Sequence, residues 1–152
     1  VRQVRGYQLD PEKIIQSAEQ TGFIEIKLPD RRNNPTRLSS LIGNIVVIDF
    51  SAYTMDEAAS HTMFLNEIYD AYHSKGLEIY QVSFDPNKLM WLEMTRNCRW
   101  VCVNDERSTE SPYILTYNIS EIPTLFLMDR QGNIVGRYNH QNIERAISEL
   151  ID

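Results

Sequence analysis

Cysteine is scarce in this sequence, in which Cys98 and Cys102 are the only thiols. Two cysteines are too few for the disulfide scaffold of a small secreted protein, and they do not decide the redox compartment. Basic residues number 15 against 21 acidic ones, and the net charge of −6 argues against a nucleic-acid partner, whose phosphates require a basic face. No apolar run approaches the roughly 20 residues that span a bilayer.

The first residues, VRQVRGYQLD, are polar and contain neither an initiating methionine nor the pattern of a signal peptide. We interpret this opening as that of an excised domain or a processed chain. The length of 152 residues suits one domain with a real core, and no repeat or linker divides the sequence. We therefore predict a single domain over 1–152, with an N-terminal extension over 1–22 and a core over 23–151.

Helical and strand patterns alternate along the chain. The run IVVIDF is apolar apart from one carboxylate, which is typical of a central strand covered on both faces. Asp85 followed by Pro86 predicts a helix start, and 108–118 predicts a short helix or turn. The predicted helices cover 10–20, 55–75, 85–97 and 140–151, and the predicted strands cover 23–28, 45–50, 77–84, 100–103, 124–128 and 134–138. Crossover connections imply parallel strands, and the last two strands form an antiparallel hairpin, so we expect a mixed sheet between helical layers.

Two segments carry a family resemblance. The run VVIDFSA and the later run EIPTLFLMDRQGNIVGRY stand in the order found in the thioredoxin-like superfamily, and the sequence resembles its TlpA/ResA-like, AhpC/TSA-type thiol-disulfide oxidoreductases over residues 23–151. The resemblance implies an α/β fold of three α/β/α layers, with a mixed central sheet and a C-terminal β-hairpin. It also implies a location in the bacterial periplasm or cell envelope.

The resemblance fails at the reactive centre. Where the family has two cysteines separated by two residues at the start of a helix, this sequence has Met55 and Ala58. A thioether cannot attack a disulfide, because the nucleophile is a thiolate. We therefore predict a domain that is redox-inactive at this junction and retains a role in binding a protein or an extended peptide segment.

The resemblance implies a binding region in which residues 53–58 lie beside the loop at Ile122 and Pro123. We expect an exposed Tyr53 as its main contact, a cis bond between Ile122 and Pro123, and a capping box in which Thr54 and Glu57 close the helix start. The candidate binding residues are Tyr53, Met55, Asp56, Glu57, Ile122 and Pro123.

Asp49 and the histidines allow further interpretations. In the family an acid at the position of Asp49 moves protons to the second cysteine, which Ala58 replaces, so we expect a structural carboxylate that is protonated or paired. His61, one helical turn after Ala58, is either a group that titrates near neutral pH or a side chain that lines the helix. His73 and His140 show no ligand spacing, and we predict no metal site and no cofactor.

The two cysteines leave a second function open. Cys98 and Cys102 are either structural thiols, a disulfide, or a displaced redox pair. In the last case the protein is a thiol-disulfide oxidoreductase that acts through this pair, or through thiols that a partner supplies. The oligomeric state is not readable from the sequence.

Overall fold

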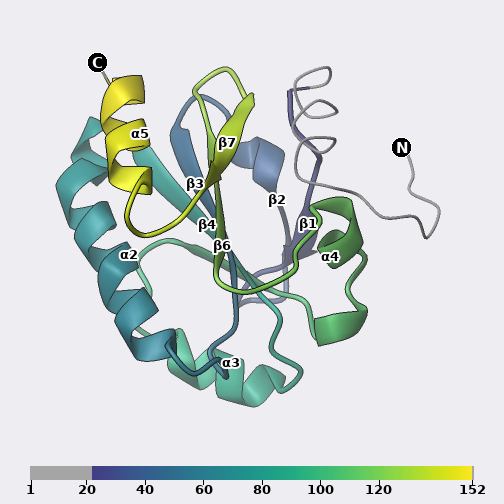
Figure 1. Ribbon diagram of the computed structural model, residues 1–152. Helices are drawn as coiled ribbons and strands as arrows, with labels where there is room; N and C mark the ends of the chain where they lie inside the picture. The colour runs from purple at the N-terminus through teal and green to yellow at the C-terminus, as the bar shows by residue number, and fades with distance from the viewer. Residues whose placement is uncertain (1–21, 152) are drawn as a thin grey trace.

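The computed structural model describes residues 22–151, and the predicted helix over 10–20 lies outside the described residues. A five-stranded sheet forms the centre of the molecule (Figure 1). Its strands are β3 (Ile45–Ser51), β4 (Leu77–Ser83), β5 (Val101–Asn104), β6 (Thr124–Met128) and β7 (Ile134–Tyr138). They lie in the order β5-β4-β3-β6-β7, with β3, β4 and β5 parallel and with β6 antiparallel to both β3 and β7. The predicted mixed sheet with a C-terminal hairpin is confirmed.

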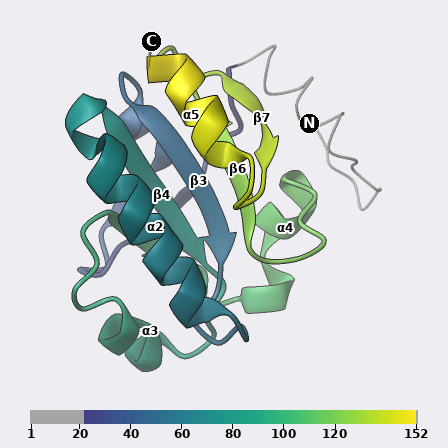
Figure 2. The same cartoon turned by 60° about the vertical axis from the view of Figure 1, so that its left-hand side comes forward.

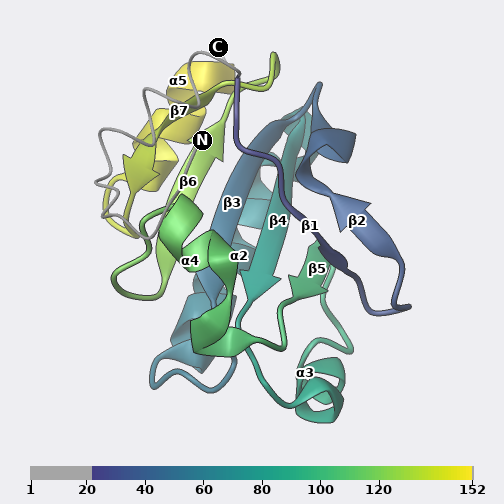
Figure 3. The same ribbon diagram turned by 90° about the vertical axis from the view of Figure 1, so that its right-hand side faces the viewer.

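Helices cover both faces of this sheet. They are α2 (Ala58–Tyr72), α3 (Lys88–Met94), α4 (Pro112–Thr116) and α5 (Ile143–Ile151). α2 and α5 cross one face side by side, whereas α4 lies against the other face with the small hairpin of β1 (Lys27–Pro29) and β2 (Pro35–Arg37) (Figures 2 and 3). The three-layer prediction is confirmed. Short 3-10 helices complete the description at Leu38–Leu41, His73–Lys75 and Ser108–Glu110.

Strand β3 is buried along its whole length because apolar clusters fill both sides of it. Val46, Ile48 and Phe50 face the α4 side, where they pack with residues of β4 and β6. Ile45 and Val47 face the α2 side, where they meet residues of α2 and α5. Asp49 and Ser51 continue this second row, so the alternation of a strand brings two polar side chains under helix α2.

Two predicted elements differ from the structure. The alternation over 23–28 predicts a strand, but only β1 from Lys27 onward is one. The preceding residues Phe23, Ile24 and Ile26 pack against the α4-side cluster as an extended segment outside the sheet ladders, so their alternation reports burial rather than strand pairing. Helix α3 begins at Lys88, because the side chain of Asn87 accepts a hydrogen bond from the Met90 amide.

Candidate functional site

A row of polar side chains crosses three neighbouring strands on the α2 side of the sheet. In the parallel registers Asp49 of β3 pairs with Gln81 of β4, and Gln81 pairs with Cys102 of β5. The amide nitrogen of Gln81 donates to Asp49 Oδ2 at 2.9 Å, and the Ser51 hydroxyl donates to the same oxygen at 2.8 Å. Asp49, Ser51 and Gln81 are almost completely buried, so these bonds replace those that water would make.

The other carboxylate oxygen of Asp49 contacts helix α2. Nε2 of His61 lies 2.8 Å from Asp49 Oδ1, and Nδ1 of His61 lies 2.9 Å from Nε2 of His140. His61 is 1% exposed and Asp49 is 0% exposed, whereas His140 reaches the surface and packs against the ring of Phe64 in a tilted arrangement. The expected structural carboxylate is therefore a paired one, with His61 as its partner.

The pKa values of the two histidines are shifted in opposite directions. Burial lowers the pKa of His61, but the Asp49 carboxylate and its hydrogen bond outweigh this effect and hold that pKa above the usual value. Burial, together with the neighbouring charge of His61, lowers the pKa of His140. These directions favour a protonated His61 that donates to both neighbours, with a neutral His140 accepting at Nε2.

The turn between β3 and α2 is held by a different carboxylate. Asp85, which is fully buried, accepts from the Tyr53 amide at 3.0 Å, from the Thr54 amide at 3.3 Å and from the Thr54 hydroxyl at 3.2 Å. Helix α2 then begins only at Ala58, and the side chain of its N-cap residue, Glu57, makes no capping hydrogen bond. The predicted capping box is wrong, because Asp85 takes the hydroxyl of Thr54 before the helix starts.

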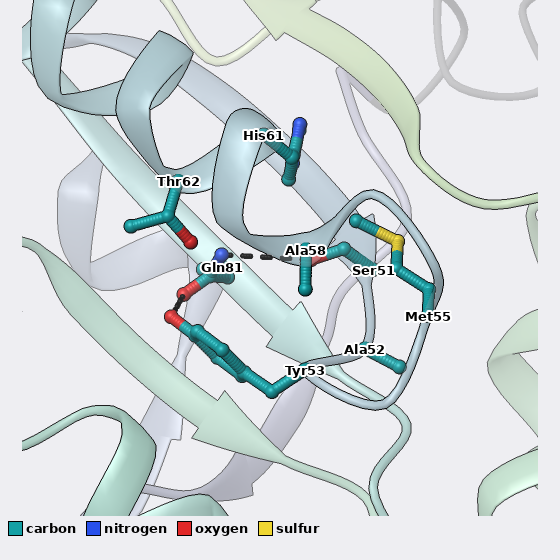
Figure 4. Close-up of a pocket in the computed structure, with 8 residues that line it drawn as sticks. All are labelled: Ser51, Ala52, Tyr53, Met55, Ala58, His61, Thr62 and Gln81. Carbon is teal, nitrogen blue, oxygen red and sulfur yellow. Dashed lines mark hydrogen bonds between the residues drawn. The ribbon is translucent and has the colours of Figure 1, made fainter.

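A shallow pocket, too narrow to admit a water molecule, lies at this turn, where Met55 and Ala58 replace the family's cysteines (Figure 4). It is lined by Ser51, Ala52, Tyr53, Met55, Ala58, His61, Thr62 and Gln81. The Tyr53 hydroxyl points inward and donates to Gln81 Oε1 at 2.7 Å (Figure 4). The expectation of an exposed Tyr53 is therefore wrong. Burial raises the pKa of this phenol, and the nearby Cys102 and Cys98 thiols add to the effect.

The loop before β6 lies next to the same turn. Thr124 pairs with Phe50 near the end of β3, which brings Ile122 and Pro123 alongside the residues that follow that strand. The Ile122–Pro123 peptide bond is cis. Within residues 22–151, the backbone N–H and carbonyl of Ile122 have no hydrogen-bond partner.

The two thiols lie at the far end of the polar row. Sγ of Cys98 and Sγ of Cys102 are 2.7 Å apart, and Cys102 is buried whereas Cys98 is partly exposed. Oε1 of Gln81 accepts from the Trp100 indole at 3.1 Å and from the Tyr53 hydroxyl, and it lies 3.6 Å from Cys102 Sγ. Gln81 thus joins the cysteine pair to Tyr53 and Asp49, although the sequence reading places the pair away from that junction.

Sequence reasoning missed three contributors: Gln81, Asp85 and His140. The position of Gln81 can be found from the sequence, because aligning the apolar runs of the three parallel strands places Gln81 between Asp49 and Cys102. The sequence pattern predicts Asp85 as the start of the following helix, and it shows no ligand spacing around His140. Across residues 22–151, no group of three or more histidine, cysteine or acidic residues is arranged to hold a metal ion. No helix in that range has the length and apolar character to cross a membrane.

Comparison with known proteins places this geometry in a family. A family model described as thioredoxin-like matches residues 43–134. Tryparedoxin of Trypanosoma brucei brucei is 30% identical over 108 residues, covering 69% of this chain and 75% of that protein. The thiol-disulfide oxidoreductase ResA of Bacillus cereus is 24% identical over 152 residues, covering 96% of this chain and 84% of that protein.

Solved structures agree with these sequence matches. The solution structure of a thioredoxin-like protein from Bacteroides vulgatus superposes with a TM-score of 0.78 at 37% identity, covering 84% of this chain and 85% of that one. The chain therefore belongs to the thioredoxin-like family, and its similarity to thiol-disulfide oxidoreductases extends over most of its length.

Proposed function

We propose that this domain binds an extended segment of a protein partner at its β3–α2 junction and performs no thiol exchange there. The binding surface, called here the junction surface, consists of Tyr53, Met55, Asp56, Glu57, Ile122 and Pro123. The observation that carries the proposal is the unpaired backbone of Ile122 beside the pocket at the turn. An extended peptide pairs with such a backbone by strand addition.

The side chains of the junction surface suit this mode of binding. Met55 is half-buried at the pocket, and its flexible thioether adapts to apolar partners of different shapes. Asp56 and Glu57 are exposed and negatively charged, which favours a segment that carries a basic residue. Tyr53 contributes the face of its ring, since its hydroxyl is already engaged by Gln81.

Loss of exchange at the junction follows from the chemistry of the two replaced positions. Neither the thioether of Met55 nor the methyl group of Ala58 can form a thiolate, so the mixed disulfide of the family's reaction cannot form there. The proposal includes the location that the family resemblance implies, the bacterial periplasm or cell envelope. Fractionation of cells that express the natural protein, followed by immunoblotting, tests this part.

The binding role is tested with a library of linear octapeptides selected on the immobilised domain. We expect selected peptides to protect the Ile122 amide from hydrogen exchange, measured by NMR, and to bind the Met55→Asp variant at least about tenfold more weakly. Met63→Asp is the matched control, because Met63 is exposed on helix α2 and lies outside the pocket lining. Peptides that bind both variants equally, or that leave the Ile122 amide unprotected, contradict the proposal.

A further inference from the structure

The backbone around the two cysteines holds them in close contact. Cys102 is fixed in β5 by its pairing with Gln81 of β4. Cys98 lies in the turn that follows α3, where its amide donates to the Thr95 carbonyl at 3.0 Å. The resulting Sγ–Sγ separation of 2.7 Å is shorter than the contact distance of two unbonded sulfur atoms. The main chain therefore brings the two thiols together.

The surroundings of the two thiols differ in the way that a redox pair requires. Cys98 is partly exposed, and Arg31 lies near it, anchored by hydrogen bonds to the Thr95 hydroxyl at 2.9 Å and the Leu92 carbonyl at 2.8 Å. The hydrogen bond from Cys102 lowers the pKa of Cys98; burial opposes this effect, the Arg31 charge adds to it, and the pKa falls below its usual value. The bond to Cys98, together with burial, raises the pKa of Cys102.

We propose that Cys98 and Cys102 form a reversible dithiol–disulfide centre that reduces disulfides, with Cys98 as the attacking thiol and Cys102 as the resolving thiol. The Cys98 thiolate attacks one sulfur of the substrate disulfide, which forms a mixed disulfide and releases the first substrate thiolate. Cys102 then loses its proton and attacks Cys98 Sγ, which closes the Cys98–Cys102 bond and releases the second thiolate. Two electrons pass to the substrate, and the protons from Cys98 and Cys102 convert its two thiolates to thiols.

Gln81 makes the state of this centre detectable inside the protein. Its Oε1 accepts from the Trp100 indole and from the Tyr53 hydroxyl, and it lies 3.6 Å from Cys102 Sγ. Closing the disulfide removes both thiol hydrogens and changes the sulfur beside this oxygen, so the surroundings of the Trp100 ring change. The centre lies beneath Tyr53 but needs no binding at the junction surface, so this inference stands or falls independently of the proposed function.

The first experiment counts thiols in the intact protein. The protein is equilibrated in glutathione buffers of increasing oxidised fraction, trapped with a maleimide and weighed by mass spectrometry. We expect the count to fall from two thiols to none in one step, with a mass loss of two hydrogens, no bound glutathione and a parallel change in tryptophan fluorescence. Excess reduced glutathione should restore both thiols. Two thiols that persist in oxidised glutathione, or a disulfide that excess dithiothreitol cannot reopen, overturn the proposal.

The second experiment assigns the roles of the two cysteines. In oxidised glutathione, Cys102→Ser should stop at a stable mixed disulfide on Cys98, whereas Cys98→Ser should keep its buried thiol free. Circular dichroism checks that both variants fold. A mixed disulfide that forms on Cys102 instead contradicts the assigned order of attack.

Two substrates then distinguish the source of the disulfide. Oxidised glutathione represents small disulfides and insulin represents protein disulfides, with dithiothreitol as the final reductant in both assays. Turnover of either one that falls to the uncatalysed rate in Cys98→Ser supports the centre and identifies its substrate class. Equal rates in the protein and in Cys98→Ser with both substrates refute it.

Discussion

Replacing His61 by leucine should destabilise the protein strongly, because it leaves the Asp49 charge buried without its partner. Asp49 is 0% exposed, and its Oδ1 has His61 Nε2 at 2.8 Å as its hydrogen-bond partner. Breaking a buried ion pair by removing one member costs about 3–5 kcal/mol. Ser51 and Gln81 still hold Oδ2, and leucine fills a similar volume, so we expect a loss near the lower end, about 3 kcal/mol.

Urea denaturation followed by circular dichroism at neutral pH measures this loss in the free energy of unfolding. A double-mutant cycle supplies the control, since Asp49→Asn removes the charge that His61 neutralises. We expect His61→Leu to cost clearly less in the Asp49→Asn background than in the natural one, with a coupling energy of about 2 kcal/mol. A cost below about 1 kcal/mol in the single variant, or additive costs in the double variant, would falsify the assignment of a charged pair.

Three further predictions concern the same region. NMR titration should give His61 a pKa above 6.5 and His140 a pKa below it. The stability that His61 contributes is then fully present below about pH 6.5 and is lost as the pH rises through its folded pKa. Urea unfolding of the protein and of His61→Gln across that pH range checks this loss. Asp85→Ala removes the acceptor of two amides and a hydroxyl and should cost about 2–3 kcal/mol, with faster hydrogen exchange at the Tyr53 amide, whereas the isosteric Asp85→Asn should cost less. In a Cys98→Ser/Cys102→Ser background, the pair Met55→Cys and Ala58→Cys should oxidise to a disulfide. The Ala58 amide donates to the Met55 carbonyl at 3.2 Å and closes a tight turn, which brings the two positions together. Free thiols that persist under oxidising conditions count against the family alignment.

Local patterns were sufficient for most of the fold. The apolar run around Val46–Phe50 and the hairpin on either side of the DRQGN turn are strands in the structure, because their residue types match the burial that the sheet imposes. Helix α5 likewise follows its apolar stripe, with Ile143 and Ile147 buried. The first residues of helices α2 and α3 are harder to predict from local patterns, because they depend on the hydrogen bonds that the side chains of Asp85 and Asn87 make.

The candidate site was predictable only in part, for a physical reason. That Asp49 is buried follows from its strand, but its partner His61 is in turn bonded to a histidine 79 residues further along the chain. Such a contact depends on how α5 and the loop before it pack on α2, which no local spacing reports. Thr54 and Glu57 have the spacing of a capping box, yet a side chain from the β4–α3 connection competes successfully for the Thr54 hydroxyl.

The segment between β4 and β5 ties the turn after β3 and the thiol pair to one stretch of chain. Asp85, near its start, fixes the backbone of Tyr53 and Thr54, and Cys98, thirteen residues later, carries the partly exposed thiol. A protein engineer who grafts residues 51–58 from a cysteine-bearing relative must therefore keep an acceptor at position 85, or the grafted turn will lose its anchor. Shortening or lengthening α3 would displace Cys98 from Cys102 of β5 while leaving Asp85 next to β4, so changes in this segment act on the thiol pair.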